Sequence, residues 1–197
     1  MATFWMKSVA SIITLLSPSA IFADPICDDL WFSRNFYFDR AGYCFSSVLG
    51  EEIFDNSDCS TDAPDLTVAE KSVISEIQEQ EQFIGCNVDI LQRRELDMEH
   101  FNQRLTLDDQ PLRSEFESAC IGYLGEPLDL HSGRNDESTV TGQIEQGDSI
   151  LLYHATPTAE LNKQTFISGV VKNNNLSQAI GWTSKILREK DCAEIAG

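Results

Sequence analysis

An aromatic groove is the first candidate for chemistry in this sequence. Tyr153, His154 and Trp182 would form its walls, with His131 and Arg134 in an adjoining loop. Aromatic walls with polar neighbours suit an extended peptide. The alternative interpretation places Trp182 in a hydrophobic core and the other side chains in solvated loops. Both interpretations remain open from the sequence.

A second candidate lies in the stretch RNFYFDRAGYCF, residues 34–45, which is rich in aromatic rings. Arg34, Asn35 and Asp39 could form a polar binding site. In a small domain, however, an arginine is more often held by a neighbour such as Asp39, or by carbonyl groups at a helix end. We therefore interpret the stretch first as a packing signature and second as a recognition surface.

Signatures of catalysis and of bound metal are weak. The pairs Ser132-Gly133 and Ser168-Gly169 lack the surrounding glycines of a nucleophile elbow. The 32 acidic residues make coincidental carboxylate pairs certain, so no glycosidase pair can be inferred. The histidines stand alone, without the spacing of zinc ligands. We expect no catalytic residues, no cofactor and no metal.

The six cysteines predict disulfides, because their number is even, no CxxC pair is present, and the chain has the start of an exported protein. Many pairings are possible, so the choice follows the expected domain layout, which keeps each bridge within one domain. We expect three disulfides: Cys44–Cys59, Cys27–Cys86 and Cys120–Cys192.

Residues 1–23 have the layout of a secretory signal peptide. Lys7 precedes an apolar run over residues 9–16, and Pro18 and the small Ala23 follow. The run is too short to span a membrane as an anchor. We expect cleavage after Ala23 and a periplasmic or secreted protein.

The formal net charge of −18 limits the choice of partners. A nucleic-acid-binding protein needs a cationic surface that displaces counterions, so nucleic acid is excluded as a direct partner. The same repulsion opposes anionic lipid headgroups. The strong negative charge is otherwise typical of a soluble exported protein.

The first half of the chain reads as helical. A helix would begin at Leu30, with Asp28 or Asp29 as its cap, and end at Gly42. A short helix would follow at about 48–54. The capping pattern TVAE at residues 67–70 then starts a third helix, which Gly85 would end.

The second half reads as strands. The polar residues 90–118 predict a linker with partial helix, and residues 119–197 contain short alternating stretches, with a hairpin turn at Gln146-Gly147-Asp148. Such strands suggest a small barrel. The predicted fold is therefore α+β, with a disulfide-linked helical module at 24–89, the linker at 90–118 and an all-β domain at 119–197.

The stretch CDDLWFSRNFYFDRAGYCF resembles the YARHG domain family of small extracellular bacterial modules. The matching positions are Leu30, Trp31, Arg34, Asn35, Arg40, Gly42, Tyr43 and Phe45. Phe38 replaces the family tyrosine, and Asp39 and Ala41 replace its alanine and histidine, so this chain lacks whatever that histidine does. The resemblance covers residues 27–86 and implies an exported, mostly helical module without a known catalytic role.

The second half resembles bacterial SH3-type barrels through LDLHSGRNDESTVTGQIEQGDSILLY and the later GWT. The matching positions are Leu128, Leu130, Ser132, Gly133, Gly142, Ile144, Gly147, Asp148, Gly181 and Trp182. This resemblance implies an SH3-like barrel that binds peptides or cell-wall fragments. A long insert, TPTAELNKQTF, departs from the compact module.

Together these observations predict a non-catalytic binding module of the cell envelope. Its partner would be a peptide, a protein or a peptidoglycan fragment, with no stable membrane insertion. The alternative function is a cell-wall hydrolase, or a regulator or inhibitor of one, since a basic hydrolase would be attracted to an acidic surface.

Overall fold

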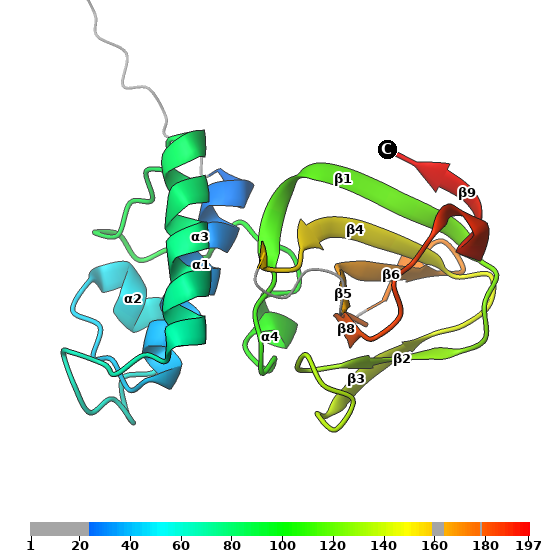
Figure 1. The fold of residues 1–197 in the computed structure, drawn as a ribbon. Helices are drawn as coiled ribbons and strands as arrows, with labels where there is room; N and C mark the ends of the chain where they lie inside the picture. The colour runs from blue at the N-terminus through cyan, green and yellow to red at the C-terminus, as the bar shows by residue number, and fades with distance from the viewer. Residues whose placement is uncertain (1–23, 159–163, 178) are drawn as a thin grey trace, which may run out of the picture.

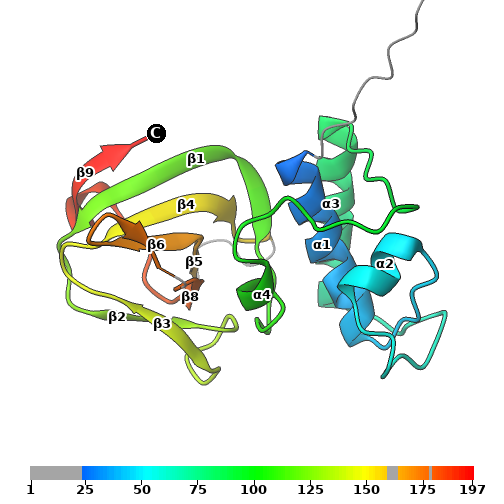
Figure 2. The same cartoon turned by 180° about the vertical axis from the view of Figure 1, so that it is seen from behind.

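The computed structural model describes residues 24–158, 164–177 and 179–197. Helices α1, α2 and α3 lie on one side of the molecule and the strands on the other, with α4 between them (Figures 1 and 2). The mixed helix and sheet composition agrees with the predicted α+β class. The expected signal segment 1–23, with Ala23, lies outside the described residues. No described helix is long and apolar enough to cross a membrane.

The helical part begins earlier than the sequence suggested. The helices are α1 (Pro25–Arg40), α2 (Val48–Ile53), α3 (Val68–Ile84) and α4 (Phe101–Arg104). Asp24 caps α1, because its carboxylate accepts the Ile26 amide at 3.0 Å and Pro25 occupies the first helical position. Asp28 and Asp29, expected as caps, instead lie inside the helix and bind other segments.

The predicted ends of α3 are confirmed. Thr67 Oγ1 accepts the backbone N–H of Glu70, and the Glu70 carboxylate accepts the N–H of Thr67, which together form the capping box. Gly85 follows the helix with φ +81°, a left-handed conformation that glycine adopts without steric cost. The short α2 also lies where it was expected.

The aromatic stretch at 34–45 supplies much of the helical core. Leu30 and Tyr37 of α1 pack with Ile77 of α3, and a second cluster on the other side of α1 joins Phe36 to Phe45. Burial of these apolar side chains is the main term that holds the three helices together. The packing interpretation of the stretch is therefore supported.

The strands form two antiparallel sheets. They are β1 (Leu112–Tyr123), β2 (Leu128–His131), β3 (Val140–Ile144), β4 (Ser149–Ala155), β5 (Thr165–Ile167), β6 (Gly169–Lys172), β7 (Asn175–Leu176), β8 (Gly181–Thr183) and β9 (Cys192–Ala196), and a 3₁₀ turn (Glu189–Asp191) precedes β9. The strand orders are β7-β6-β4-β1-β9 and β3-β2-β8-β5. A shared core of side chains from both sheets, including Ile144, Ile150 and Val170, fills the space between them.

The expected SH3-like barrel is not confirmed, since the described strands form two open sheets rather than one closed barrel. The turn at 146–148 also differs from the predicted hairpin. Strand β3 pairs with β2, whereas β4 pairs with β1 and β6, so this turn passes between the sheets. The N–H of Gly147 donates to the carbonyl of Tyr123, which ties the turn to the end of β1 instead.

Part of the expected linker 90–118 belongs to the β part. Residues 112–118 lie in β1, whose long bulge between Arg113 and Ser118 interrupts the pairing with β4. The sequence there is polar because most of these side chains face solvent. Leu107 and Gln110, by contrast, are fully buried, so the preceding residues pack firmly between the two parts.

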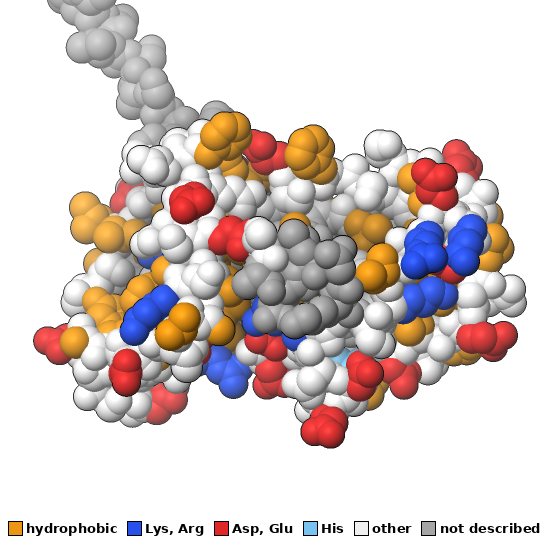
Figure 3. All heavy atoms as spheres, viewed as in Figure 1, with side chains coloured by type: hydrophobic (Ala, Val, Ile, Leu, Met, Phe, Trp, Pro, Cys, Tyr) orange, Lys and Arg blue, Asp and Glu red, His pale blue; other side chains and the backbone are white. Residues whose placement is uncertain are grey.

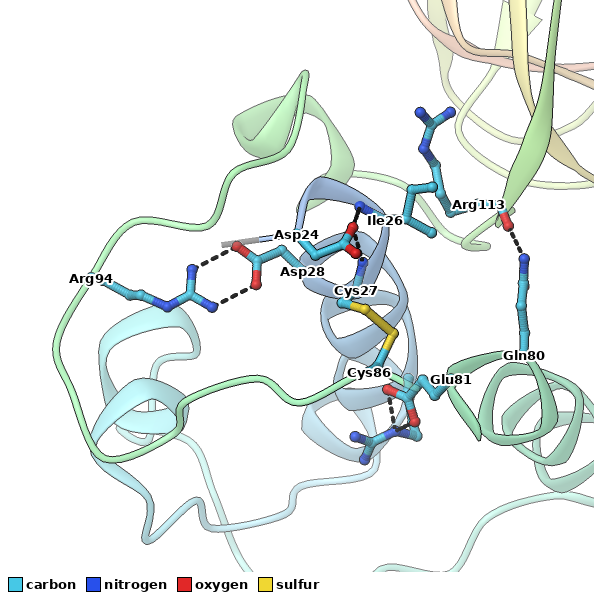
Figure 4. Close-up of a disulfide and its surroundings, with 10 residues drawn as sticks. Asp24, Ile26, Cys27, Asp28, Gln80, Glu81, Cys86, Arg94 and Arg113 are labelled. Atoms are coloured by element: carbon cyan, nitrogen blue, oxygen red, sulfur yellow. Dashed lines mark hydrogen bonds and ion pairs between the residues drawn. A yellow bond between two sulfur atoms is a disulfide. The ribbon is translucent and has the colours of Figure 1, made fainter. Parts of the chain in front are cut away.

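Three disulfides join the pairs expected from the domain layout. Cys27–Cys86 connects α1 to the end of α3, Cys44–Cys59 closes a loop before α3, and Cys120–Cys192 links the adjacent strands β1 and β9. Figure 4 shows the first of these between the two helices. Each bridge reduces the number of conformations open to the unfolded chain and so stabilises the fold, by roughly 2–5 kcal/mol in small exported domains.

Candidate functional site

The two parts of the molecule meet at a buried ion pair. Arg104 of α4 donates from Nη1 and Nη2 to the two carboxylate oxygens of Asp29, at 3.1 and 3.0 Å. Its Nε donates to Gln110, and Nη2 also donates to Ser33. The Arg104 and Asp29 side chains are 1% and 5% exposed, so each polar atom there needs a protein partner. The hydrogen bonds of Arg104 supply these partners.

His154 and Ser168 extend this network in an order that resembles a catalytic triad. His154 Nε2 lies 2.9 Å from Asp29 Oδ2, and its Nδ1 lies 3.1 Å from Ser168 Oγ. A Ser–His–Asp chain of this kind activates the serine in hydrolases. Ser168 could act as a nucleophile only if a substrate could reach it and if its oxygen had a free lone pair.

Ser168 meets neither condition. It is 1% exposed, and its Oγ accepts the backbone N–H groups of Tyr153 and His154 at 3.0 and 3.1 Å. These two N–H groups occupy both lone pairs of the oxygen, so none is left for attack on a substrate. The Asp29–His154–Ser168 chain therefore joins the two parts of the protein and offers no nucleophile.

The charges of this network follow from burial. Burial alone would raise the pKa of Asp29, but the Arg104 guanidinium and the His154 ring hold it well below its usual range. Burial lowers the pKa of His154 to about 4, in spite of the adjacent carboxylate. At neutral pH the network thus contains one ion pair, Arg104 with Asp29, and a neutral imidazole. No group of three or more potential metal ligands occurs in the described ranges.

The structure does not bring the predicted aromatic groove together. Trp182 is fully buried, packs against Phe166 with ring centroids 5.1 Å apart, and donates its indole N–H to the carbonyl of Asp109. His154 faces Asp29 rather than solvent. Two of the three expected walls are therefore core side chains, because the strands that carry them turn these faces toward the helical part or the second sheet.

The Tyr153 ring lies 4.8 Å from that of the buried His154, and Tyr153, His131 and Arg134 each have their own partners in the protein. Tyr153 donates from its hydroxyl to Glu99, and Arg113 covers its ring at 4.5 Å. His131 lies in β2 with Nδ1 3.1 Å from the carbonyl of Ser138. Arg134 donates to Asp109 and lies 5.6 Å from the Trp182 ring, which it shields.

Arg34 and Asn35, in contrast, line one hollow of about 480 Å³, which we call the Arg34 hollow. Its walls come from α1, the segment 43–47, the end of α3 and the segment 86–90. Trp31, Tyr43 and Phe45 supply apolar surface there. The hollow combines apolar walls with a few polar groups, which is the usual composition of a binding site.

The polar groups that line the Arg34 hollow make only some of their possible hydrogen bonds within the protein. Arg34 Nε donates to both carboxylate oxygens of Glu81, at 3.1 and 2.9 Å. Glu81 therefore holds Arg34, in place of Asp39 or the helix-end carbonyls expected from the sequence. Asn35 Nδ2 donates to the carbonyl of Trp31 at 2.7 Å. In Figure 4 the Glu81 carboxylate faces a guanidinium close to Cys86.

Two other predicted residues, Tyr153 and Arg134, each line a different hollow. Tyr153 borders one of about 580 Å³ between the start of α1 and the strands β1 and β4, together with Glu99 and Arg113. Arg134 borders one of about 310 Å³ near the start of α3. Acidic side chains are spread over both parts of the face in Figure 3 rather than gathered at one hollow.

Sequence reasoning missed the partners of the two central arginines. Asp29 looked like a helix cap, Arg104 lay in a stretch interpreted as linker, and Glu81 looked like part of a solvated helix face. One signal was available for Glu81. It precedes the Ile84–Gly85 helix end by one turn and Cys86 by five positions, so the Cys27–Cys86 bridge brings it toward α1.

Two family models match the chain. The model described as Domain of unknown function (DUF4453) matches residues 85–197, and the model described as YARHG domain matches residues 9–82. The second match agrees with the resemblance of residues 27–86, while neither match is to an SH3-type module. Comparisons with curated proteins and with solved structures give no match.

Proposed function

We propose that this chain, which belongs to the family described as Domain of unknown function (DUF4453) and also carries a YARHG domain, is an exported, non-catalytic binding protein of the cell envelope. Its ligand is a peptide, a protein or a cell-wall fragment. The Arg34 hollow carries this proposal, since it combines an accessible guanidinium with apolar walls.

The location in the proposal has two supports. Three disulfides fit an oxidising, extracytoplasmic compartment, and the YARHG domain resembles modules of exported proteins. We propose that residues 1–23 act as the signal peptide, with cleavage after Ala23. The likeness to SH3-type modules adds a reason to expect peptide binding, but the proposal does not depend on a closed barrel.

Hydrolase activity has less support than binding. The chain of groups that most resembles a hydrolase centre, Asp29–His154–Ser168, is buried and internally satisfied. A regulator of a wall hydrolase would bind its target through a surface, and it therefore falls within the same binding proposal.

A pull-down tests the proposal. The oxidised protein is immobilised, exposed to envelope extract and to purified muropeptides, and the retained material is identified by mass spectrometry. We expect a defined peptide, protein or muropeptide to be retained, and to be lost from the Arg34→Met variant. Arg93→Met is the matched control, because Arg93 pairs with Glu52 on the exposed surface, outside the Arg34 hollow. Retention of nothing by correctly disulfide-bonded protein would overturn the binding proposal.

A further inference from the structure

Resting on this proposed function, we propose that the Arg34 hollow binds the backbone of one residue in an extended peptide. Arg34 would donate to the carbonyl oxygen of that residue, and Asn35 would accept the N–H of the same residue, because in an extended chain these two groups point to the same side. The ligand class is thus an uncharged stretch of peptide with a small apolar side chain beside the bound amide. The argument uses the hydrogen-bonding capacity left over in the hollow.

Arg34 retains donors that the protein does not use. A guanidinium has five N–H groups, and only the one on Nε has a partner, the Glu81 carboxylate. No acceptor among the described residues bonds to Nη1 or Nη2 of Arg34. The side chain is 21% exposed at the hollow, and Glu81 fixes its orientation. Arg34 therefore presents a positioned donor edge to a ligand.

Asn35 retains an acceptor beside this donor edge. It is 9% exposed, its Nδ2 donates to the Trp31 carbonyl, and nothing in the described part of the chain donates to its Oδ1. Because the Trp31 carbonyl must accept, the nitrogen of the Asn35 amide faces it and the oxygen is the remaining group. The Oδ1 atom is open to solvent, so the N–H of a ligand can take the place of water there.

The pair selects an amide over a carboxylate. Arg34 is already neutralised by Glu81, so it offers hydrogen bonds with little net charge. The Asn35 oxygen would repel a carboxylate oxygen but would accept an N–H. Each residue of an extended peptide presents one acceptor and one donor on the same side, which matches the two groups. The formal charge of −18 opposes anionic ligands further.

The walls favour a peptide over a sugar. Sugars usually stack on the open face of an aromatic ring, whereas Trp31 and Phe45 are each only 6% exposed. The partly exposed Tyr43 ring makes edge contacts with Phe38 and Phe45, at centroid distances of 6.0 and 5.0 Å. Val88 and Ile90 add aliphatic surface on the opposite wall. This surface suits a methyl or a small apolar side chain next to the bound amide.

Two disulfides preorganise the hollow. Cys44–Cys59 holds the segment that carries Tyr43 and Phe45, and Cys27–Cys86 holds the segment at 86–90 against α1. Walls that are fixed before binding reduce the entropy lost when the ligand is ordered.

The test is an NMR titration of the oxidised protein, with arginine, asparagine and tryptophan side chains labelled. The probe is a neutral blocked dipeptide, N-acetyl-alanyl-alanine methylamide. The matched probe replaces the central amide by an ester, which removes the N–H that Asn35 would accept. We expect shifts at Trp31, Arg34 and Asn35 with the amide, and at least tenfold weaker binding of the ester.

A third probe, the trimer of N-acetylglucosamine, tests the sugar alternative. Binding of this trimer alone, equal binding of amide and ester, or shifts that avoid the hollow would each overturn the inference. The variant Arg34→Lys keeps the charge but loses the planar fork, and it should weaken binding of the amide at least tenfold. Arg93→Lys should not change it, and unchanged thermal unfolding of both variants shows that they fold.

The outcome separates this inference from the function on which it rests. A ligand captured from the envelope in the pull-down, with no shifts in the Arg34 hollow on addition of the blocked dipeptide, would leave the binding function standing and refute the amide site. Failure of the pull-down would refute the binding function itself.

Discussion

Replacement of Arg104 by methionine should destabilise the protein strongly. Methionine keeps much of the apolar stem but removes the guanidinium that binds both oxygens of Asp29. Gln110 and Ser33 lose a donor at the same time. The Asp29 side chain is 5% exposed, so water cannot replace the lost partner without opening the structure.

The size of the effect follows from this burial. Removal of one member of a buried ion pair costs about 3–5 kcal/mol, because the other charge stays in a medium of low polarity. Asp29 could escape part of the cost by taking up a proton, since burial raises its pKa once the attraction of Arg104 is gone. The loss should therefore be smaller at pH 5 than at pH 7.

Arg93→Met provides the matched comparison. Arg93 also contacts a single carboxylate, that of Glu52, but the two side chains are 69% and 42% exposed. Solvent screening reduces the contribution of such a pair to about 0–1 kcal/mol. The assay is denaturant unfolding of each oxidised variant, followed by far-ultraviolet circular dichroism. Equal, small losses for Arg104→Met and Arg93→Met at pH 7 would refute the argument that the buried network joins the two parts.

Three further changes test other parts of the structure. Burial lowers the pKa of His154 to about 4, below the value of about 6.5 in an unfolded chain, so the unfolded state binds more protons between these values. The free energy of unfolding should then fall by about 3 kcal/mol from pH 7 to pH 4 through this group, and His154→Gln should remove that part of the slope, whereas His131→Gln should keep it. Replacement of Cys120 and Cys192 by alanine should lower the free energy of unfolding by about 2–5 kcal/mol, and a calorimetric scan that matches wild type would contradict this. Thr67→Ala removes the cap of α3 and should cost about 0.5–2 kcal/mol, while the neighbouring exposed Val68→Ala should leave the thermal midpoint almost unchanged.

Local signals in the sequence predicted the helices well. The start of α3 depends on residues only three positions apart, and its end depends on one glycine, so both can be read without knowledge of the fold. The start of α1 was harder, because Asp24, Asp28 and Asp29 are all good caps. Pro25, which favours the first helical position, is the residue that distinguishes Asp24.

Arrangement over long distances was harder to predict. The sequence gives the strands of the β part by alternation, but the choice between a barrel and two open sheets depends on which strands pair. The turn at 146–148 has hairpin residues and yet connects different sheets. The predicted aromatic groove does not form for a similar reason, since alternation does not say which face of a strand meets the helical part.

Arg34 and Arg104 look alike in the sequence, and their contacts explain why we place only Arg34 in the proposed binding site. Arg104 uses Nε and both Nη atoms for partners within the protein, and its side chain is 1% exposed. Arg34 uses only Nε and remains 21% exposed. A guanidinium whose donors are all satisfied contributes to stability alone, whereas one held by a single carboxylate is oriented and still has donors for a ligand. That leftover capacity, which depends on contacts between distant segments, is the physical basis for our proposal that the helical part binds a ligand.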